Sequence, residues 1–235
     1  MEPAKNIIEL RQLLAERFPG TRFSVATPLS DLQGPVWPTG ILAIDSILAG
    51  GLPKAAITEL TRTHLTSGSS LLLRKLLRQV HVTGQRVALV DGSDSFAPDC
   101  LGTEVLSRLL WVRCEKADQA LKATDLLLRD GNVPLVLLDL QLNPALQLRR
   151  VPASIWHRFQ RLVETTSALL VVFTSQPMVG GARVRLSLQG RFPLPALLKT
   201  EEELLTDLRF KLLRSRERVP DPVPNPDAVA VSGVG

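Results

Sequence analysis

The sequence predicts an α/β domain in which a mostly parallel β-sheet is flanked by helices, preceded by an N-terminal helix and a linker. From Thr39 onward, apolar runs of strand length alternate with helical patterns, and these runs are rich in Val and Leu without polar alternation. Strands of this kind are buried on both faces, which requires helices on each side of a parallel sheet. The runs predict strands at residues 55–60, 86–90, 109–114, 133–138 and 168–174, with helices at 69–83, 117–129 and 155–165.

The 235 residues suit one domain with short extensions. Residues 6–18 carry apolar side chains at helical spacing and end at a Pro-Gly pair, which predicts an amphipathic helix. Residues 21–38 hold three prolines and are predicted to be a linker on the surface. We therefore expect an N-terminal helix and linker at 1–38, a core domain at 39–219 and a disordered tail at 220–235. Two runs late in the core, 184–188 and 208–213, alternate polar and apolar residues and predict more exposed strands.

Composition narrows the class of protein. The formal net charge is +5 and the isoelectric point is about 9.7, which is compatible with nucleic-acid binding without establishing it. Cys100 and Cys114 have no metal-type spacing, and buried free thiols in a cytoplasmic protein are expected. The apolar runs are too short to cross a bilayer, so no membrane segment is predicted.

The segment that precedes the first core strand carries a distinctive pattern. It contains Thr39-Gly40, then Asp45, then Leu48-Ala-Gly50-Gly51 and a proline. The paired glycines allow positive φ between a short helix and the strand. An ordinary helix-to-strand turn is the plainer explanation of the glycines alone. The whole string, however, resembles the segment of bacterial RecA and its relatives that leads into their nucleotide-binding strand. The resemblance covers about residues 38–219 and implies a RecA-like P-loop NTPase core.

In such a core the next element is a strand, a P-loop and a helix, and here the P-loop is degraded. The motif reads Gly-x-x-x-x-Gly-Lys followed by Ser or Thr. The matching residues are 63–70, where Gly68 and Ser70 survive, Thr63 replaces the first Gly and Ser69 replaces the Lys. The Lys supplies the charge that neutralises the transferred phosphates. We therefore expect weak ATP binding at most, and no efficient hydrolysis.

Three further positions follow from the resemblance. The family's catalytic Glu would fall at Ser93, with Asp94 one residue beyond; a surface turn is the plainer interpretation of Asp91-Gly-Ser-Asp94. Asp139 follows four apolar residues, as a Walker B acid does, although a strand-terminal Asp also serves as a helix cap. Gln176 matches the family's γ-phosphate sensor. The candidate degenerate nucleotide site is thus Thr63, Gly68, Ser69, Ser70, Asp139 and Gln176, with no catalytic residue and no required cofactor.

The resemblance also places two DNA-binding loops. Residues 141–154, with Arg149 and Arg150, take the position of the first loop, and residues 177–185, with Arg183 and Arg185, that of the second. Both are predicted to lie on loops that leave the carboxyl ends of strands, where they would contact phosphates of single-stranded DNA. A solvated charged face is the alternative for each cluster alone. A third basic cluster alternates along the last strand and its exit: Arg209, Lys211, Arg214, Arg216 and Arg218.

A short RecA-like chain with degraded ATPase motifs resembles the ImuA-type accessory proteins of bacterial mutagenesis cassettes. That resemblance implies a cytoplasmic pseudo-ATPase in SOS damage tolerance, with RecA and translesion polymerase components as partners and with oligomerisation open. Two alternatives stay open: a divergent DNA-dependent ATPase that uses Asp139 and Asp94, and a regulatory scaffold that does not bind DNA.

Overall fold

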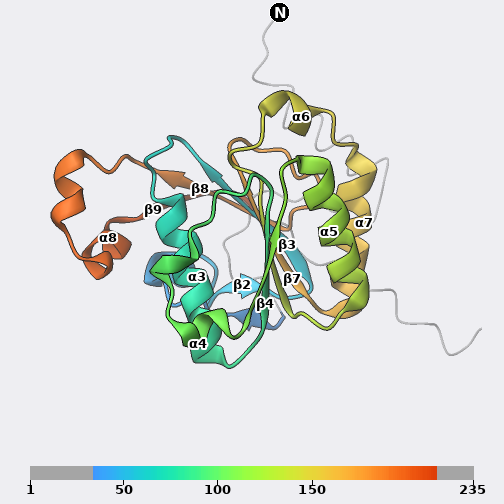
Figure 1. Cartoon of the computed structure of the whole chain (residues 1–235), viewed down its shortest axis with the longest axis horizontal. Helices are drawn as coiled ribbons and strands as arrows, with labels where there is room; N and C mark the ends of the chain where they lie inside the picture. Colours follow the sequence, from blue (N-terminus) through green and yellow to red (C-terminus); the bar gives the residue numbers. More distant parts are fainter. Residues whose placement is uncertain (1–33, 216–235) are drawn as a thin grey trace, which may run out of the picture.

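The computed structural model describes residues 34–215, and within them the chain forms one large sheet between two layers of helices (Figure 1). Its seven strands lie in the order β5-β4-β6-β7-β3-β8-β9, and all neighbours are parallel except β8 and β9. The predicted parallel α/β sheet is therefore confirmed. The strands are β3 (Ala56–Arg62), β4 (Val87–Asp91), β5 (Leu109–Arg113), β6 (Leu135–Asp139), β7 (Leu169–Thr174), β8 (Val184–Gln189) and β9 (Arg209–Ser215).

Each face of the sheet has its own hydrophobic core. On one face α2 (Leu42–Ile47), α3 (Ser69–Thr83) and α4 (Thr103–Leu106) cover the strands. On the other, α5 (Ala117–Asp130) and α7 (Ala153–Thr166) lie side by side. The central strands are buried on both faces, which explains why their sequences lack polar alternation. None of the helices in residues 34–215 has the length and apolar character that a membrane span requires.

The linker predicted at residues 21–38 lies mostly outside the described residues, and its last part joins the fold. Val36–Trp37 forms strand β1, which pairs antiparallel with β2 (Leu52–Pro53), and Trp37 is only 2% exposed. Its indole Nε1 donates a hydrogen bond to Gln85 Oε1 at 2.9 Å. Trp37 is therefore buried in the core, whereas Val36 is half-buried. The predicted helix at 6–18 and the tail at 220–235 lie outside the described residues.

The Thr-Gly, Asp and Gly-Gly pattern has a structural cause. The Asp45 carboxylate accepts hydrogen bonds from the Thr39 N–H at 3.0 Å, from its hydroxyl at 2.7 Å and from the Gly40 N–H at 3.1 Å, which fixes the start of α2. Gly51 has φ +144°, and a Cβ there would lie 2.2 Å from the carbonyl oxygen of Trp37. Only glycine fits where β1 and β2 pass so closely.

Besides α4, two short helices lie in segments for which no helix was predicted. One is α6 (Ala145–Arg149), at the top of Figure 1, within the segment predicted as the first DNA loop. The other is α8 (Glu201–Asp207), which lies with a 3₁₀ turn (Leu194–Leu198) in the long connection between β8 and β9. A capping box between Thr200 and Glu203 begins α8. Thr-x-x-Glu is readable in the sequence, so this start could have been predicted.

Candidate functional site

The structure brings the predicted nucleotide-site residues to one edge of the sheet. Asp139 ends β6, Gln176 follows the end of β7 by two residues, and Thr63 follows the end of β3. These three strands are neighbours and parallel, so their carboxyl ends meet. Ligands of open parallel sheets bind at such an edge. Gln176 is exposed there.

The loop at residues 63–68, where the degenerate P-loop was predicted, is hydrogen-bonded to the end of β8 and the residues that follow it. The N–H and the hydroxyl of Thr63 both donate to the Leu188 carbonyl at 3.1 Å. The Phe192 N–H donates to the Thr66 carbonyl at 2.9 Å. Ser67, which is buried, accepts from the His64 N–H at 3.0 Å and donates to the His64 carbonyl at 2.8 Å. A phosphate in this loop would compete with these contacts for the same N–H groups.

Gly68, the glycine of the motif that this sequence retains, lies under apolar side chains. It is the N-cap of α3 with φ +90°, the left-handed conformation that the turn into the helix requires. A Cβ added to it would lie 2.6 Å from Phe192 and 2.7 Å from Leu208. Ser69 is 5% exposed, whereas Ser70 is exposed. Because a glycine has no Cβ, the connection between β8 and β9 can pack closely over the loop at this position.

Arg62, the last residue of β3, supplies a cation that the sequence did not single out. Its Nη2 donates to the Gln141 carbonyl at 3.0 Å, and its charge acts on Asp139. Burial raises the pKa of Asp139 to about 6, and nearby Asp91 adds to the rise, against hydrogen bonding from Gln141 and the charge of Arg62. Asp91 and Asp139 are cross-strand neighbours of β4 and β6. The sequence held a signal for the pair of Arg62 and Asp139, because Arg62 stands at the end of a buried strand and directly before the first P-loop position.

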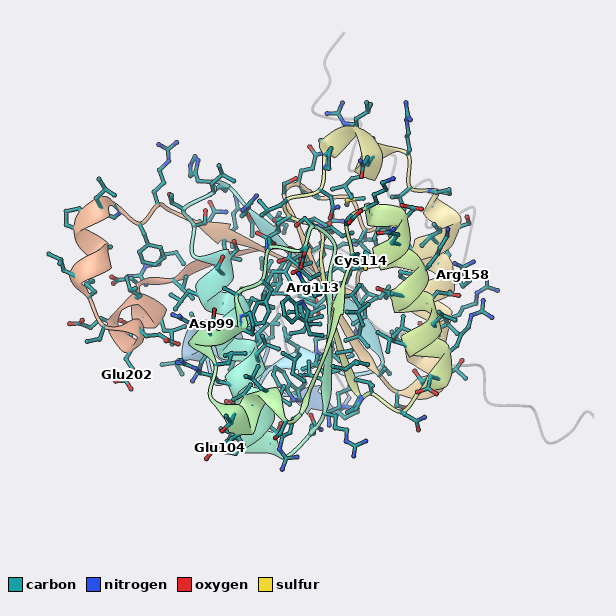
Figure 2. All side chains as sticks on the ribbon, in the orientation of Figure 1. Asp99, Glu104, Arg113, Cys114, Arg158 and Glu202 are labelled. Carbon is teal, nitrogen blue, oxygen red and sulfur yellow. The ribbon has the colours of Figure 1, made fainter. Side chains whose placement is uncertain are left out.

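The end of β4 holds no free carboxylate in the expected catalytic position. Asp94 binds Arg113 through two hydrogen bonds of 2.7 Å, and these bonds lower the pKa of Asp94. Figure 2 labels Arg113, whose guanidinium also lies 5.0 Å from the ring centre of Trp111. Asp91 is 1% exposed and accepts the Phe96 N–H at 2.8 Å, so it fixes the turn. The segment is a turn as expected, but only Ser93 and Asp94 reach the surface, because Asp91 and Gly92 are buried.

A buried carboxylate on β3 was missed. Glu59 is fully buried, and its Oε1 accepts hydrogen bonds from the Thr174 hydroxyl at 3.0 Å and from the N–H groups of Met178 at 2.7 Å and Val179 at 3.1 Å. Its Oε2 pairs with Arg185 Nε. A single Glu inside an otherwise apolar or neutral strand run was the available signal.

The four predicted DNA-binding arginines do not form one surface. Arg149 and Arg150 are exposed at the end of α6. The prediction that Arg183 and Arg185 lie on a loop at the carboxyl edge is wrong. The segment after β7 runs back so that β8 can start parallel to β3, and the Arg183 N–H bonds to the Ile57 carbonyl at 2.8 Å. Arg185 lies in β8, where Glu59 binds its guanidinium.

Comparison with curated proteins finds bacterial RecA proteins over part of the chain. RecA of Methylococcus capsulatus is 35% identical over 108 residues, 44% of this chain and 30% of that protein. RecA of Symbiobacterium thermophilum is 30% identical over 146 residues, which cover 59% of this chain and 41% of that protein. RecA of Francisella tularensis subsp. novicida is 34% identical over 108 residues, which cover 44% of this chain and 30% of that protein. The chain thus spans less than half the length of these relatives. No protein-family model matches the chain.

The fold and its site define an α/β protein with a strand, loop and helix (residues 56–83) at the carboxyl edge of a mostly parallel sheet. The partial homology to RecA supports placing this protein in the RecA-like superfamily.

Proposed function

We propose that the chain is an accessory protein of bacterial DNA-damage tolerance, of the ImuA type, that acts through protein and DNA contacts without hydrolysing ATP. The main support for the proposal is that groups of the loop at residues 63–68 already have hydrogen-bond and packing partners within the protein. Its polar groups bond to one another and to the segment 188–192, and Phe192 packs on Gly68. Homology to RecA supports the link to DNA repair.

The residues present do not suit magnesium and ATP in the usual manner. Asp139 is the residue that would hold Mg²⁺, yet Arg62 already provides a positive charge at that carboxylate. Ser69 stands where a Lys would neutralise phosphate charge, and Asp94 is bound to Arg113. The Lys and the catalytic Glu are therefore replaced, and Asp139 and Asp94 lie beside arginines, whereas Ser70 and Gln176 are retained.

A divergent ATPase is the competing function. The meeting of Ser70, Asp139 and Gln176 at one sheet edge favours it, because the edge itself is retained. A scaffold that does not bind DNA is the third alternative, and the engagement of Arg185 by Glu59 favours it over extensive DNA contact.

The test is phosphate release from ATP, measured on the full chain with and without single-stranded DNA. We expect the rate to equal that of the Ser70→Ala/Asp139→Ala variant, since neither residue then takes part in turnover. The same two proteins are compared by thermal shift with Mg²⁺ and ATP. A rate that depends on DNA and is abolished by the double substitution establishes the ATPase instead.

Partner binding is tested directly. The proposal expects the chain to bind purified RecA or translesion polymerase components of its own bacterium in biolayer interferometry. Absence of binding to all of them removes the accessory role and leaves the RecA-like fold with another task.

A further inference from the structure

A groove of about 440 Å³ opens on the helical layer formed by α5 and α7, away from the degenerate P-loop. It lies between the start of α5 and the turn that joins α6 to α7, on the right of the sheet in Figure 1. Its lining residues are Lys116, Ala117, Asp118, Leu121, Lys122, Gln147, Arg150, Val151, Pro152, Ile155 and Arg158.

The floor of the groove is aliphatic and firmly held. Leu121 belongs to the core between the sheet and α5, and Val151 and Ile155 pack against the same core. Pro152 is the N-cap of α7 with φ −63°, which the ring fixes. An apolar side chain that entered the groove would therefore meet a preformed apolar surface.

The rim is positively charged. Lys122 lies 3.7 Å from Asp118, and Arg158, labelled in Figure 2, binds Asp125 at 2.7 Å. Among the described residues, no ion pair involves Lys116 or Arg150, and both are exposed. Asp118 is the sole carboxylate in the lining. Two of the four cations are thus available to a ligand.

Two helix N-termini add to this potential. The helices α5 and α7 have 14 residues each, and the N-cap of each lines the groove: Lys116 for α5 and Pro152 for α7. Neither N-cap side chain accepts a hydrogen bond from its helix. The first-turn N–H groups and the helix dipoles favour a carboxylate there. A Lys at an N-cap is unfavourable for the helix alone, and an anionic ligand reverses that penalty.

We propose that this groove docks an acidic segment of a partner protein, with one or two bulky aliphatic side chains on the floor and carboxylates at Lys116, Arg150 and the two helix ends. Single-stranded DNA fits less well, because the lining holds no aromatic side chain on which a base could stack. The proposal rests on the accessory function above for its biological setting, but its test does not depend on ATP or on RecA.

The test begins with a displayed library of random peptides panned against the full chain. Recovered peptides are synthesised, and their affinities are measured by fluorescence anisotropy. We expect peptides in which Asp or Glu flanks Leu, Ile or Phe. Their affinity should fall about tenfold or more for Lys116→Glu/Arg150→Glu, and should weaken with salt.

The matched control is Arg86→Glu/Arg161→Glu. It makes the same charge change at two exposed arginines, neither of which lines the groove. We expect this control to leave peptide affinity within about twofold. Ile155→Ser should weaken peptide binding, because it removes an apolar side chain from the floor of the groove. Circular dichroism checks that this variant folds. Peptides that lack acidic enrichment, that bind both charge variants equally, or that are absent altogether overturn the proposal.

A labelled oligothymidine is measured with the same variants. If it displaces the peptides and loses affinity with Lys116→Glu alone, a residue outside the predicted DNA contacts of α6, the groove is a nucleic-acid site and the protein-docking proposal is wrong. Failure of the accessory function would appear separately, as loss of RecA and polymerase binding while peptide binding persists.

Discussion

Glu59 and Arg185 form a cross-strand ion pair on the neighbouring parallel strands β3 and β8, with the carboxylate fully buried and the Arg185 side chain 17% exposed. The same carboxylate accepts the N–H groups of Met178 and Val179, and Arg185 Nη2 donates to the Val179 carbonyl at 3.0 Å. The pair therefore anchors the segment after β7, which the resemblance to RecA had placed as a DNA-binding loop.

We predict that Arg185→Ala lowers the free energy of unfolding by roughly 3–5 kcal/mol, because it leaves the Glu59 charge buried without its partner. Urea denaturation measures the change. Arg149→Ala, an exposed arginine, is the control and should cost about 0.5 kcal/mol or less. The variant Glu59→Gln/Arg185→Met should recover part of the loss, and equal costs for both arginines would contradict the ion-pair assignment.

The raised pKa of Asp139 predicts a pH dependence of stability. The pKa is about 6 in the folded chain and near 3.8 in the unfolded one, so the folded state binds more protons between these values. The free energy of unfolding should then fall as the pH rises from about 4 to about 6, by roughly 3 kcal/mol at most. Asp139→Asn should lack this fall, which urea titrations between pH 4 and pH 8 would detect.

Asp94→Asn is the control for that experiment, because its pH dependence lies outside the range measured. Arg113 lowers the pKa of Asp94 below its ordinary value of 3.8, so the contribution of this carboxylate is complete above that pH, and Asp94→Asn should keep the fall of the parent between pH 4 and pH 6. A stability difference between Asp139→Asn and the parent that stays constant with pH would contradict the burial of Asp139.

DNA binding is predicted to depend on the end of α6 rather than on four arginines. Arg149→Ala/Arg150→Ala should weaken binding to single-stranded DNA and flatten the log–log salt slope by about 1.4, which is roughly 0.7 for each lost phosphate contact. Fluorescence anisotropy over a salt series measures both. An unchanged slope would show that these arginines are solvated surface or serve a protein partner.

Gly51→Ala is predicted to destabilise the fold by about 2 kcal/mol or more, because a Cβ there meets the Trp37 carbonyl and the backbone has positive φ. Gly84→Ala is the matched control. Gly84 also has positive φ, at +68°, but nothing lies within 4 Å of an added Cβ, so about 1 kcal/mol is expected. Thermal unfolding compares the two, and equal costs would remove the steric argument.

Much of the fold was predictable because its information is local. The helix over α3 matches its predicted bounds, and the central strands begin and end within about two residues of the apolar runs that predicted them. The sequence also predicted that the carboxyl ends of the parallel strands meet at one edge, which brings together Asp139, Gln176 and Thr63. The pairing of Val36–Trp37 as strand β1 did not follow, because it depends on partners 15 to 17 residues away.

The sequence by itself determined the α/β class, the order of strands and helices along the chain, and the loss of the P-loop lysine at Ser69. Only the tertiary structure decided which groups the charged side chains contact. Whether Arg185 meets DNA or Glu59, and whether Arg62 acts on Asp139, depends on which strands become neighbours. Strand neighbours are set by long-range packing of the whole sheet, which no local pattern of residues encodes.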